Sequence, residues 1–291
     1  MTSRNASAEL IAFQGAPGAY SDLACRQVFP AMATLPCETF EDAMAAVRDG
    51  QAALAMLPIE NSVAGRVADI HHLMPHSGLH IIGEHFQRVS HHLLAPKGAA
   101  IAGLKRVRSH VHALSQCRTL IRRLGLKAVV AADTAGAAAE VAERGDPTEA
   151  AIASELAGEI YGLVSLEQNI EDAEHNTTRF LIMAREPRPV PRDGSLVVTT
   201  FVFRVRNVPA ALYKALGGFA TNGVNMTKIE SYMVGGRFTA TQFYADVEGH
   251  PEDRPLELAL DELRFFSREV TILGTYPAHP FRRAASQSEA D

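Results

Sequence analysis

The chain has 291 residues, of which 47% are hydrophobic and 21% charged, so it can build the cores of two globular domains. A net charge of -5 argues against nucleic acid or an anionic membrane as partner and favours small molecules and proteins. Three widely spaced cysteines without a CxxC pair argue against a disulfide framework and a zinc site. The opening MTSRNASAEL holds no apolar leader, so we expect a cytoplasmic protein.

Up to about residue 185, short apolar runs alternate with amphipathic helical stretches, which predicts an α/β domain with mostly parallel sheets. The expected strands are 10–13, 53–57, 127–131, 150–153 and 180–184. The expected helices are 20–29, 40–48, 113–124 and 136–144. Sheets of this kind bind ligands beyond the carboxyl ends of their strands.

The next segment, REPRPVPRDGS from Arg185, combines three prolines with charges and a glycine, so we expect a linker over 186–196. The order that follows is strand 197–205, helix 210–221, strands 224–232 and 238–247, helix 256–266 and strand 270–276. This βαββαβ order predicts a ferredoxin-like domain. The last residues, 281–291, are typical of a disordered polar tail.

Polar residues gather at the ends of the expected strands. GAPGAYS (15–21) follows the first strand, and the N–H groups at the start of the next helix can hold an anion. PIENS (58–62) follows the strand 53–57, where Ser62 is expected to cap a helix that begins at Val63. That cap leaves Glu60 and Asn61 unexplained.

Three further strand ends carry the same kind of residue, namely Ser109-His110 leading to Gln116, Asp133-Thr134, and Ser154. Each alone is an ordinary helix cap, but five such ends in one domain indicate a shared site. The segment EHNTTRFLIMA (174–184) adds an amide, two hydroxyls and a guanidinium directly before a buried strand. Hydroxyls, amides and helix starts suit a carboxylate ligand, and no nucleophile triad is evident.

Two histidine pairs, His71-His72 and His91-His92, have no cysteine or carboxylate at metal-ligand spacing. We therefore expect partly exposed structural histidines at these positions.

In these motifs the chain resembles prephenate dehydratase, the enzyme family that converts prephenate to phenylpyruvate in phenylalanine biosynthesis. The resemblance covers about 10–281 and includes SHVHALSQC (109–117), DTAGAA (133–138), AAIAS (150–154) with YGL (161–163), and NTTRF (176–180). It implies a two-lobed catalytic domain over 8–185, like a periplasmic binding protein, with no metal or organic cofactor. The lobes would be 8–86 with 175–185, and 87–174, and the active site would lie in the cleft between them.

The resemblance also assigns roles to particular residues. It selects Thr178, which precedes the Arg-Phe of the family motif, as the essential threonine that assists the departing hydroxyl. The other catalytic positions that it implies are Glu60, Asn61, Ser109 and Gln116. The substrate-binding residues that it implies are Ala19, Tyr20, Ser21, Ser62, Thr134, Ser154, Asn176, Thr177, Arg179 and Phe180.

The segment 197–280 resembles an ACT domain, the regulatory unit that binds phenylalanine in this family, usually between subunits. The implied phenylalanine-binding residues are Asn207, Ala210, Ala211, Leu212, Asn225, Glu230 and Ser231. The chain departs from the family pattern at Tyr232-Met233, where Arg-Pro is usual, and at Tyr213, where a smaller valine is usual. The ACT resemblance and the exposed sheet edge of such a domain imply a homodimer or homotetramer.

Two alternatives stay open. An arogenate dehydratase would need a pocket for an amino group in place of the keto group. A non-catalytic amino-acid sensor would use the same fold only for binding. The joint presence of the five catalytic positions argues against the sensor.

Overall fold

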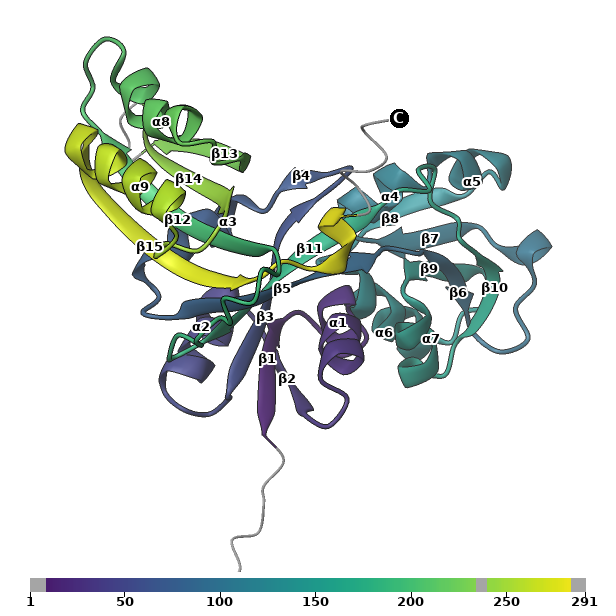
Figure 1. Cartoon of the computed structure of the whole chain (residues 1–291). Coiled ribbons are helices and arrows are strands. Elements are labelled where there is room, and N and C mark those ends of the chain that lie inside the picture. The colour runs from purple at the N-terminus through teal and green to yellow at the C-terminus, as the bar shows by residue number, and fades with distance from the viewer. Residues whose placement is uncertain (1–8, 234–239, 284–291) are drawn as a thin grey trace, which may run out of the picture. The chain divides into compact units, whose positions relative to one another are not determined.

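The computed structural model describes residues 9–233 and 240–283, and the chain divides into two compact units. The first unit consists of Met1–Ile70 and His85–Phe180, and the second of His71–Glu84 and Leu181–Asp291. The boundaries fall inside strands β5 (His80–Arg88) and β11 (Thr177–Ala184), which Figure 1 labels.

One sheet of the first unit carries the N-terminal strands. β1 (Leu10–Gln14) runs parallel to β2 (Ala33–Cys37) and to β3 (Leu54–Asn61), and β11 lies beside β3. Helices α1 (Tyr20–Val28) and α2 (Phe40–Arg48) make the connections between these strands. β1 and β3 are buried over most of their length, which explains their continuous apolar composition.

The other sheet of the first unit has the strand order β10-β6-β9-β7-β8. β7 (Arg106–Ser109) pairs in parallel with β8 (Lys127–Val130) and with β9 (Glu149–Ala153). β6 (His92–Ala95) pairs antiparallel with β9 and with β10 (Val164–Gln168). This sheet is therefore mixed, whereas the alternation of strands and helices in the sequence predicts mostly parallel pairing.

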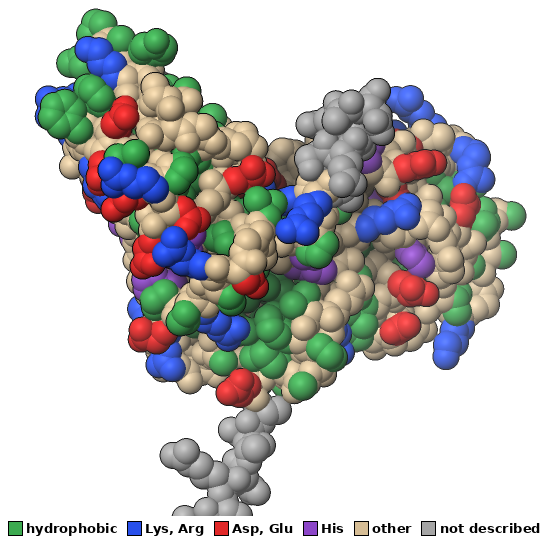
Figure 2. Space-filling model, in the orientation of Figure 1, with side chains coloured by type: hydrophobic (Ala, Val, Ile, Leu, Met, Phe, Trp, Pro, Cys, Tyr) green, Lys and Arg blue, Asp and Glu red, His purple; other side chains and the backbone are tan. Residues whose placement is uncertain are grey.

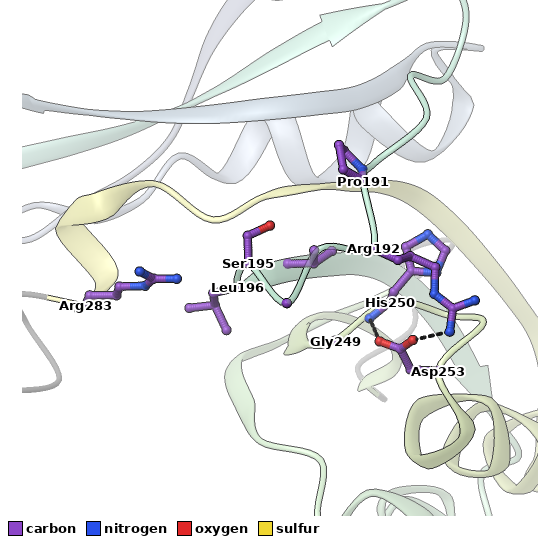
Figure 3. Close-up of a pocket in the computed structure, with 10 residues that line it drawn as sticks. Pro191, Arg192, Ser195, Leu196, Gly249, His250, Asp253 and Arg283 are labelled. Atoms are coloured by element: carbon purple, nitrogen blue, oxygen red, sulfur yellow. Dashed lines mark hydrogen bonds and ion pairs between the residues drawn. The ribbon is translucent and has the colours of Figure 1, made fainter.

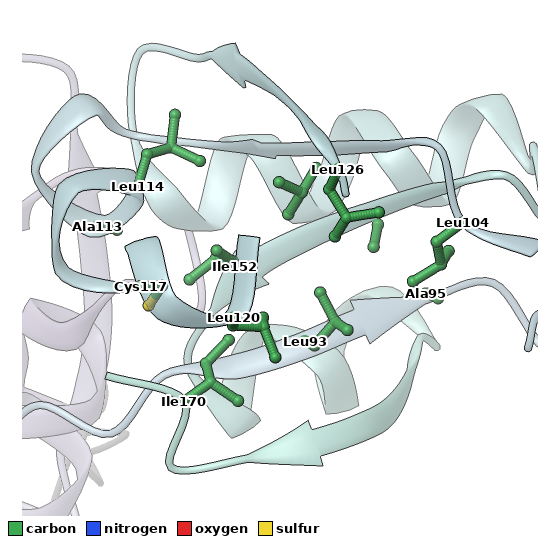
Figure 4. Packing of buried hydrophobic residues seen from close by; sticks show 12 residues of the cluster. Leu93, Ala95, Leu104, Ala113, Leu114, Cys117, Leu120, Leu126, Ile152 and Ile170 are labelled. Carbon is green, nitrogen blue, oxygen red and sulfur yellow. The ribbon is translucent and has the colours of Figure 1, made fainter. Parts of the chain in front are cut away.

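Helices cover both faces of this sheet. Successive residues of a strand point to opposite sides, so neighbouring residues pack against different helices. Figure 4 shows Leu93 of β6 and Ile152 of β9 packed with Leu120, which belongs to α5 (Arg118–Arg123). The neighbouring strand residues Leu94 and Ala151 instead pack with helices on the other face. The helices of the two faces are α4 (Val111–Gln116) with α5, and α6 (Thr134–Arg144) with α7 (Glu155–Tyr161).

The helix expected over 113–124 is broken, and this prediction is wrong. Cys117 leaves the helical conformation, with φ -123° and ψ 32°, and separates α4 from α5. The carboxylate of Asp172 accepts hydrogen bonds from the backbone N–H groups of Arg118 and Thr119 at 3.0 and 3.2 Å. Such a distant cap satisfies the start of a second helix and has no signature in the local sequence.

The helix expected from Val63 is also wrong, and Ser62 is not a helix cap. β3 continues through Asn61, pairs with β4 (Gly65–Arg66), and the next helix is α3 (Ala68–Leu73). The Ser62 hydroxyl donates to the carbonyl of His175 at 2.8 Å and accepts from the backbone N–H of Thr177 at 3.0 Å. The serine therefore joins the PIENS segment to the start of β11.

The second unit contains the ferredoxin-like βαββαβ order that the sequence predicts. Its sheet has the antiparallel order β13-β14-β12-β15, and β15 also pairs with β5 through Gly274 and Ile81. Two of the residues expected in the strand 238–247, Phe238 and Thr239, lie outside the described residues. The elements are β12 (Val197–Val205), α8 (Ala211–Thr221), β13 (Met226–Met233), β14 (Ala240–Glu248), α9 (Arg254–Phe266) and β15 (Ser267–Pro277).

The remaining segments are short. Residues 185–196 form no helix or strand, and 3₁₀ turns cover Met74–His76 and Ile101–Gly103. The expected disordered tail begins with residues 281–283, which belong to a helical turn, and 284–291 lie outside the described residues. On the face shown in Figure 2, acidic and basic side chains are interspersed.

Candidate active site

A cavity of about 540 Å³ lies in the first unit, where polar segments from its two sheets meet. Segments that follow the carboxyl ends of β1, β3 and β7 contribute to its lining, as does the start of β11. The site residues expected from the sequence that line it are Ala19, Tyr20, Ser21, Asn61, Gln116, Thr134, Thr178 and Phe180.

Thr178 lies in the wall of this cavity with its hydroxyl oxygen bound to Asn61. The Asn61 amide Nδ2 donates to Thr178 Oγ1 at 2.9 Å and to Asn176 Oδ1 at 2.8 Å. Asn61 Oδ1 accepts from the backbone N–H groups of Val63 and Ala64 at 2.9 and 2.7 Å, which fixes the orientation of the amide. The Thr178 oxygen is thus an acceptor, and the hydrogen of its hydroxyl is available for a ligand.

Hydrogen bonds continue from Asn176, which is buried beside this cavity and does not line it, to Tyr20. Asn176 Nδ2 donates to Gln116 Oε1 at 2.9 Å, and His91 Nε2 lies 3.0 Å from the same oxygen. His91 Nδ1 lies 2.9 Å from the Tyr20 hydroxyl. Burial, the Glu171 carboxylate and Cys117 together raise the pKa of Tyr20 well above its ordinary value, so its phenol is neutral. We call this run of side chains, Thr178–Asn61–Asn176–Gln116–His91–Tyr20, the amide chain.

Glu60 and Arg179 form an ion pair and do not line the cavity. Arg179 Nη1 lies 2.9 Å from Glu60 Oε1, and the guanidinium lies 6.0 Å from the centre of the Phe86 ring. Arg179 is only 2% exposed, so it needs a nearby counter-charge. The pair joins the end of β3 to the start of β11, where Arg179 directly follows Thr178 in the chain.

Four other expected site residues make contacts within the protein and do not line the cavity. The Ser109 hydroxyl is buried and donates to the carbonyl of Ile152 at 2.6 Å. The Ser154 hydroxyl accepts from the backbone N–H of Ala157 and donates to the carbonyl of Gly18. Ser62 and Thr177 bind each other beside the cavity.

Helix starts and ionisable side chains complete the lining. The first turns of α1 and α6 reach the cavity through Ala19 and Thr134, and the side chain of Asp133 caps α6. Burial lowers the pKa of His110, its neighbour His112 adds to this effect, and Asp133 opposes it. His112, Arg66 and Asp69 also line the cavity, and the sequence analysis assigned them no role.

The expectation of partly exposed histidines is wrong for three of the four residues. His71, His91 and His92 are 1%, 2% and 6% exposed, and only His72 lies at the surface. His91 lines the cavity, so it belongs to the candidate site, although the sequence analysis did not include it there. The adjacency of a histidine to the start of a core strand was the signal that could have singled it out.

The described residues contain no cluster of metal ligands and no helix that could span a membrane. No group of three or more histidine, cysteine, aspartate or glutamate side chains in that part of the chain could hold a metal ion. None of its helices is both long enough and apolar enough to cross a membrane.

A second cavity, of about 450 Å³, lies in the ferredoxin-like unit at the start of α8. Two of the residues expected to bind phenylalanine do not line this cavity: Asn225 pairs with Glu248, and Glu230 pairs with Lys228. Tyr232 is buried against the rings of His71 and His72, and Tyr213 lines the cavity but is 81% exposed. The residues expected to bind phenylalanine that line this cavity are Asn207, Ala210, Ala211, Leu212 and Ser231.

A third cavity, of about 520 Å³, lies between residues 191–197 and the segment that follows β14. Figure 3 shows Arg192 and Asp253 in its wall, joined by a hydrogen bond of 2.6 Å. It contains none of the site residues expected from the sequence.

Comparison with known proteins assigns the chain to a family. The family model for prephenate dehydratase matches residues 11–188. The chain belongs to the prephenate dehydratase family. It is therefore an enzyme, a carbon–oxygen lyase, and the resemblance seen in its motifs is confirmed.

Relatives extend this likeness over nearly the whole chain. A bifunctional N-acyl-homoserine lactone acylase/prephenate dehydratase of Komagataeibacter europaeus is 60% identical over 274 residues, 94% of this chain and 98% of the relative. Arogenate dehydratase/prephenate dehydratase 2 of Arabidopsis thaliana is 39% identical, covering 94% of this chain and 74% of the relative. The crystal structure of prephenate dehydratase from Arthrobacter aurescens in complex with L-Phe is 31% identical with a TM-score of 0.84, covering 97% and 98% of the two chains.

Proposed function

We propose that this prephenate dehydratase family member converts prephenate to phenylpyruvate, CO2 and water in phenylalanine biosynthesis, and that its active site is the cavity lined by Thr178. The observation that carries this proposal is the hydroxyl of Thr178, which accepts from Asn61 and keeps its own hydrogen for the cavity. The departing group of prephenate is a hydroxyl, and it leaves more readily when a donor binds it.

The side chains that line the cavity suit an elimination whose driving force is the aromaticity gained by the substrate ring. Loss of the ring hydroxyl and the ring carboxylate makes the ring aromatic, so the enzyme must chiefly help hydroxide to depart. A threonine hydroxyl is far too weak an acid to ionise near neutrality, so Thr178 acts as a hydrogen-bond donor. One well-placed donor of this kind is worth on the order of 3 kcal/mol.

The two carboxylates of prephenate make opposite demands on the cavity. The ring carboxylate leaves as CO2, and a cation bound to it would oppose that loss, so the neutral amides near Thr178 suit it. The pyruvyl carboxylate keeps its charge, and the N–H groups at the start of α1, from Ala19 to Ser21, suit it. A structure with substrate bound in the reverse orientation would contradict this assignment.

Turnover of prephenate tests the function. The purified protein is incubated with prephenate, with and without EDTA, and phenylpyruvate is followed at high pH. Thr178→Ala is run beside Thr177→Ala, a matched control whose side chain does not line the cavity. Loss of turnover in Thr178→Ala alone supports the proposal, and an inactive wild type contradicts it.

The nearest alternative is dehydration of arogenate, because several relatives are arogenate dehydratases. Arogenate carries an ammonium group where prephenate carries a keto group. Comparing kcat/KM for the two substrates side by side decides between them.

A second activity, hydrolysis of N-acyl-homoserine lactones, is favoured by the 60% identity to a bifunctional acylase and dehydratase. Among the described residues that line the cavity, no serine or cysteine is hydrogen-bonded to a histidine, so a conventional nucleophile pair does not support it. Release of homoserine lactone from an N-acyl derivative, measured for wild type and Thr178→Ala, tests whether the activity exists and shares the cavity.

We further propose that the unit from 197 to 280 is an ACT domain that binds phenylalanine as a feedback effector. Support comes from the 450 Å³ cavity and from Ala210 in its wall, whose φ of +61° is uncommon for a residue other than glycine. Because Tyr232 packs away from this cavity against His71, its presence in place of arginine does not fill the pocket. Phenylalanine should inhibit turnover, and the Ala210→Trp variant should lose that inhibition and keep its activity.

Assembly and location stay predictions. The exposed edge strand β13 and the exposed Ile229 and Met233 on it favour a homodimer or homotetramer. Light scattering of the purified protein measures the assembly, and fractionation of the source cells tests the expected cytoplasmic location.

A further inference from the structure

The directions of the hydrogen bonds in the amide chain determine which ring nitrogens of His91 carry a hydrogen. Asn61 is fixed by two backbone N–H groups, so its Nδ2 faces Asn176. The Asn176 oxygen must then accept from Asn61, and its Nδ2 must donate to Gln116 Oε1. His91 Nε2 lies 3.0 Å from that oxygen, so it must carry a hydrogen.

The other ring nitrogen faces an equally fixed partner. The Tyr20 hydroxyl lies 2.6 Å from the carbonyl oxygen of Ser90, which can only accept, so the single phenolic hydrogen points there. His91 Nδ1, at 2.9 Å from the Tyr20 oxygen, must then donate as well. Every bond of the amide chain is satisfied only when His91 is an imidazolium, whereas a neutral ring leaves Tyr20 one hydrogen for two acceptors.

The groups packed around His91 decide when it is charged. Burial lowers the pKa of His91 and His92 adds to this effect, while Gln116 and Glu171 oppose it. Glu171 accepts the backbone N–H of His91, and its Oε1 is buried with no hydrogen-bond partner in the described part of the chain, 3.8 Å from Arg88 Nη2. Burial raises the pKa of both Tyr20 and Cys117, so neither adds a negative charge. The other charged or titratable side chains that face the cavity are Arg66, Asp69, His110, His112 and Asp133.

We propose that His91 is a positioning residue that takes up a proton when a dianionic substrate enters the cavity, and so completes the amide chain that orients Thr178. The inference rests on the proposed function, because prephenate brings two carboxylates. Negative charge beside a buried imidazole favours its protonated form. The imidazolium then holds Gln116 and Tyr20, and through Asn176 it supports the position of the Asn61 amide that binds Thr178 Oγ1. The ring keeps both protons during the reaction.

Steady-state kinetics across pH separate this role from a merely structural one. In His91→Gln the amide replaces the ring without titrating, so kcat should lose the decline that wild type shows as pH rises through the pKa of bound His91. His91→Leu breaks the chain, and its kcat should fall on the order of tenfold to a hundredfold. His92→Gln is the matched control, because His92 is equally buried but binds Ser165 and does not line the cavity. A His91→Gln variant with the wild-type pH profile, or a fully active and folded His91→Leu, would overturn the proposal.

Nuclear magnetic resonance of isotope-labelled histidine reads the ring directly. With prephenate bound to Thr178→Ala at neutral pH, the His91 signal, assigned by its loss in His91→Gln, should change from one ring proton to two. A ring that stays neutral with prephenate bound, in a protein whose wild type turns prephenate over, contradicts this proposal alone. A wild type that does not turn prephenate over contradicts the proposed function instead.

Discussion

Two buried polar clusters of the molecule are built from different chemistry. In the first unit the amide chain joins Thr178 to Tyr20 through neutral amides and one histidine. In the second unit Arg282 holds Glu84 through Nε at 2.7 Å and Nη2 at 2.9 Å, and Asp246 lies 3.6 Å from Nη2. Both carboxylates are fully buried, so this cluster contains whole charges where the amide chain has dipoles.

The proposed function gives a physical reason for this difference. In the proposed reaction, a strong cation bound to the ring carboxylate would oppose its loss, whereas a neutral donor binds the departing hydroxyl without that penalty. The full charges of the Arg282 cluster join the segment after β15 to β5 and β14. Full charges therefore hold the Arg282 cluster together, whereas the hydrogen bonds next to Thr178 come from neutral amides.

Breaking the charged cluster should give the largest effect, on stability. Arg282→Ala leaves two buried carboxylates near each other without their guanidinium, which should lower the free energy of unfolding by about 3–5 kcal/mol. Urea unfolding measures the change. Arg264→Ala, at an exposed pair with Asp261, is the control and should cost at most about 0.5 kcal/mol. A similar cost in both variants would show that the Arg282 cluster has no special weight.

Substituting Thr178, at one end of the amide chain, should lower turnover and leave the free energy of unfolding nearly unchanged. Thr178→Ala removes the proposed donor to the departing hydroxyl, so kcat should fall by about 10² to 10³, which corresponds to about 3–4 kcal/mol. Thr178→Ser keeps the hydroxyl and should retain most of the activity. If the serine variant were as inactive as the alanine variant, a packing role for the threonine methyl would replace the hydrogen-bond role.

Placing a full charge in the amide chain sharpens the comparison. Asn61→Asp keeps the shape and the two bonds from the backbone N–H groups of Val63 and Ala64, but it cannot donate to Thr178. We expect kcat to fall roughly tenfold to a hundredfold and KM for the dianionic substrate to rise. Gln51→Glu, at an exposed position of the same unit, is the control with the same change of charge. Unchanged kinetics in Asn61→Asp would remove Asn61 from the chemistry.

The smallest effect concerns pH and His91 in the free protein. Burial holds the pKa of folded His91 below that of the unfolded chain, about 6.5, so the folded state binds this proton less readily. The stability that the neutral ring contributes is present above about 6.5 and is lost as pH falls toward the folded pKa. His91→Gln should therefore lose less stability between neutral and mildly acidic pH than wild type. If wild type and His91→Gln lost equal stability over this pH range, the lowered pKa of His91 would be contradicted. His175→Gln, at an exposed position, is the control.

Much of the architecture was readable from the sequence. The continuous apolar runs of β1, β3 and β9 identified buried strands, and the βαββαβ order of the second unit followed from the change of hydrophobic period. These patterns are local, because burial of a strand or of one helix face dictates the spacing of apolar residues. The family resemblance carried by the polar motifs selected Thr178, Asn61 and Gln116, which the structure brings together at one cavity.

The tertiary structure alone decided the partners of those polar residues. The break at Cys117 depends on Asp172, and the bonds of Ser62 depend on His175 and Thr177, far along the chain. Glu60 and Arg179 satisfy each other, and Ser109 binds a neighbouring strand, whereas His91 enters the cavity wall. The sequence determined which chemical groups reach the ends of the strands, since that depends on local periodicity. Which of them face the cavity depends on long-range hydrogen bonds and burial, which arise only when distant segments pack together.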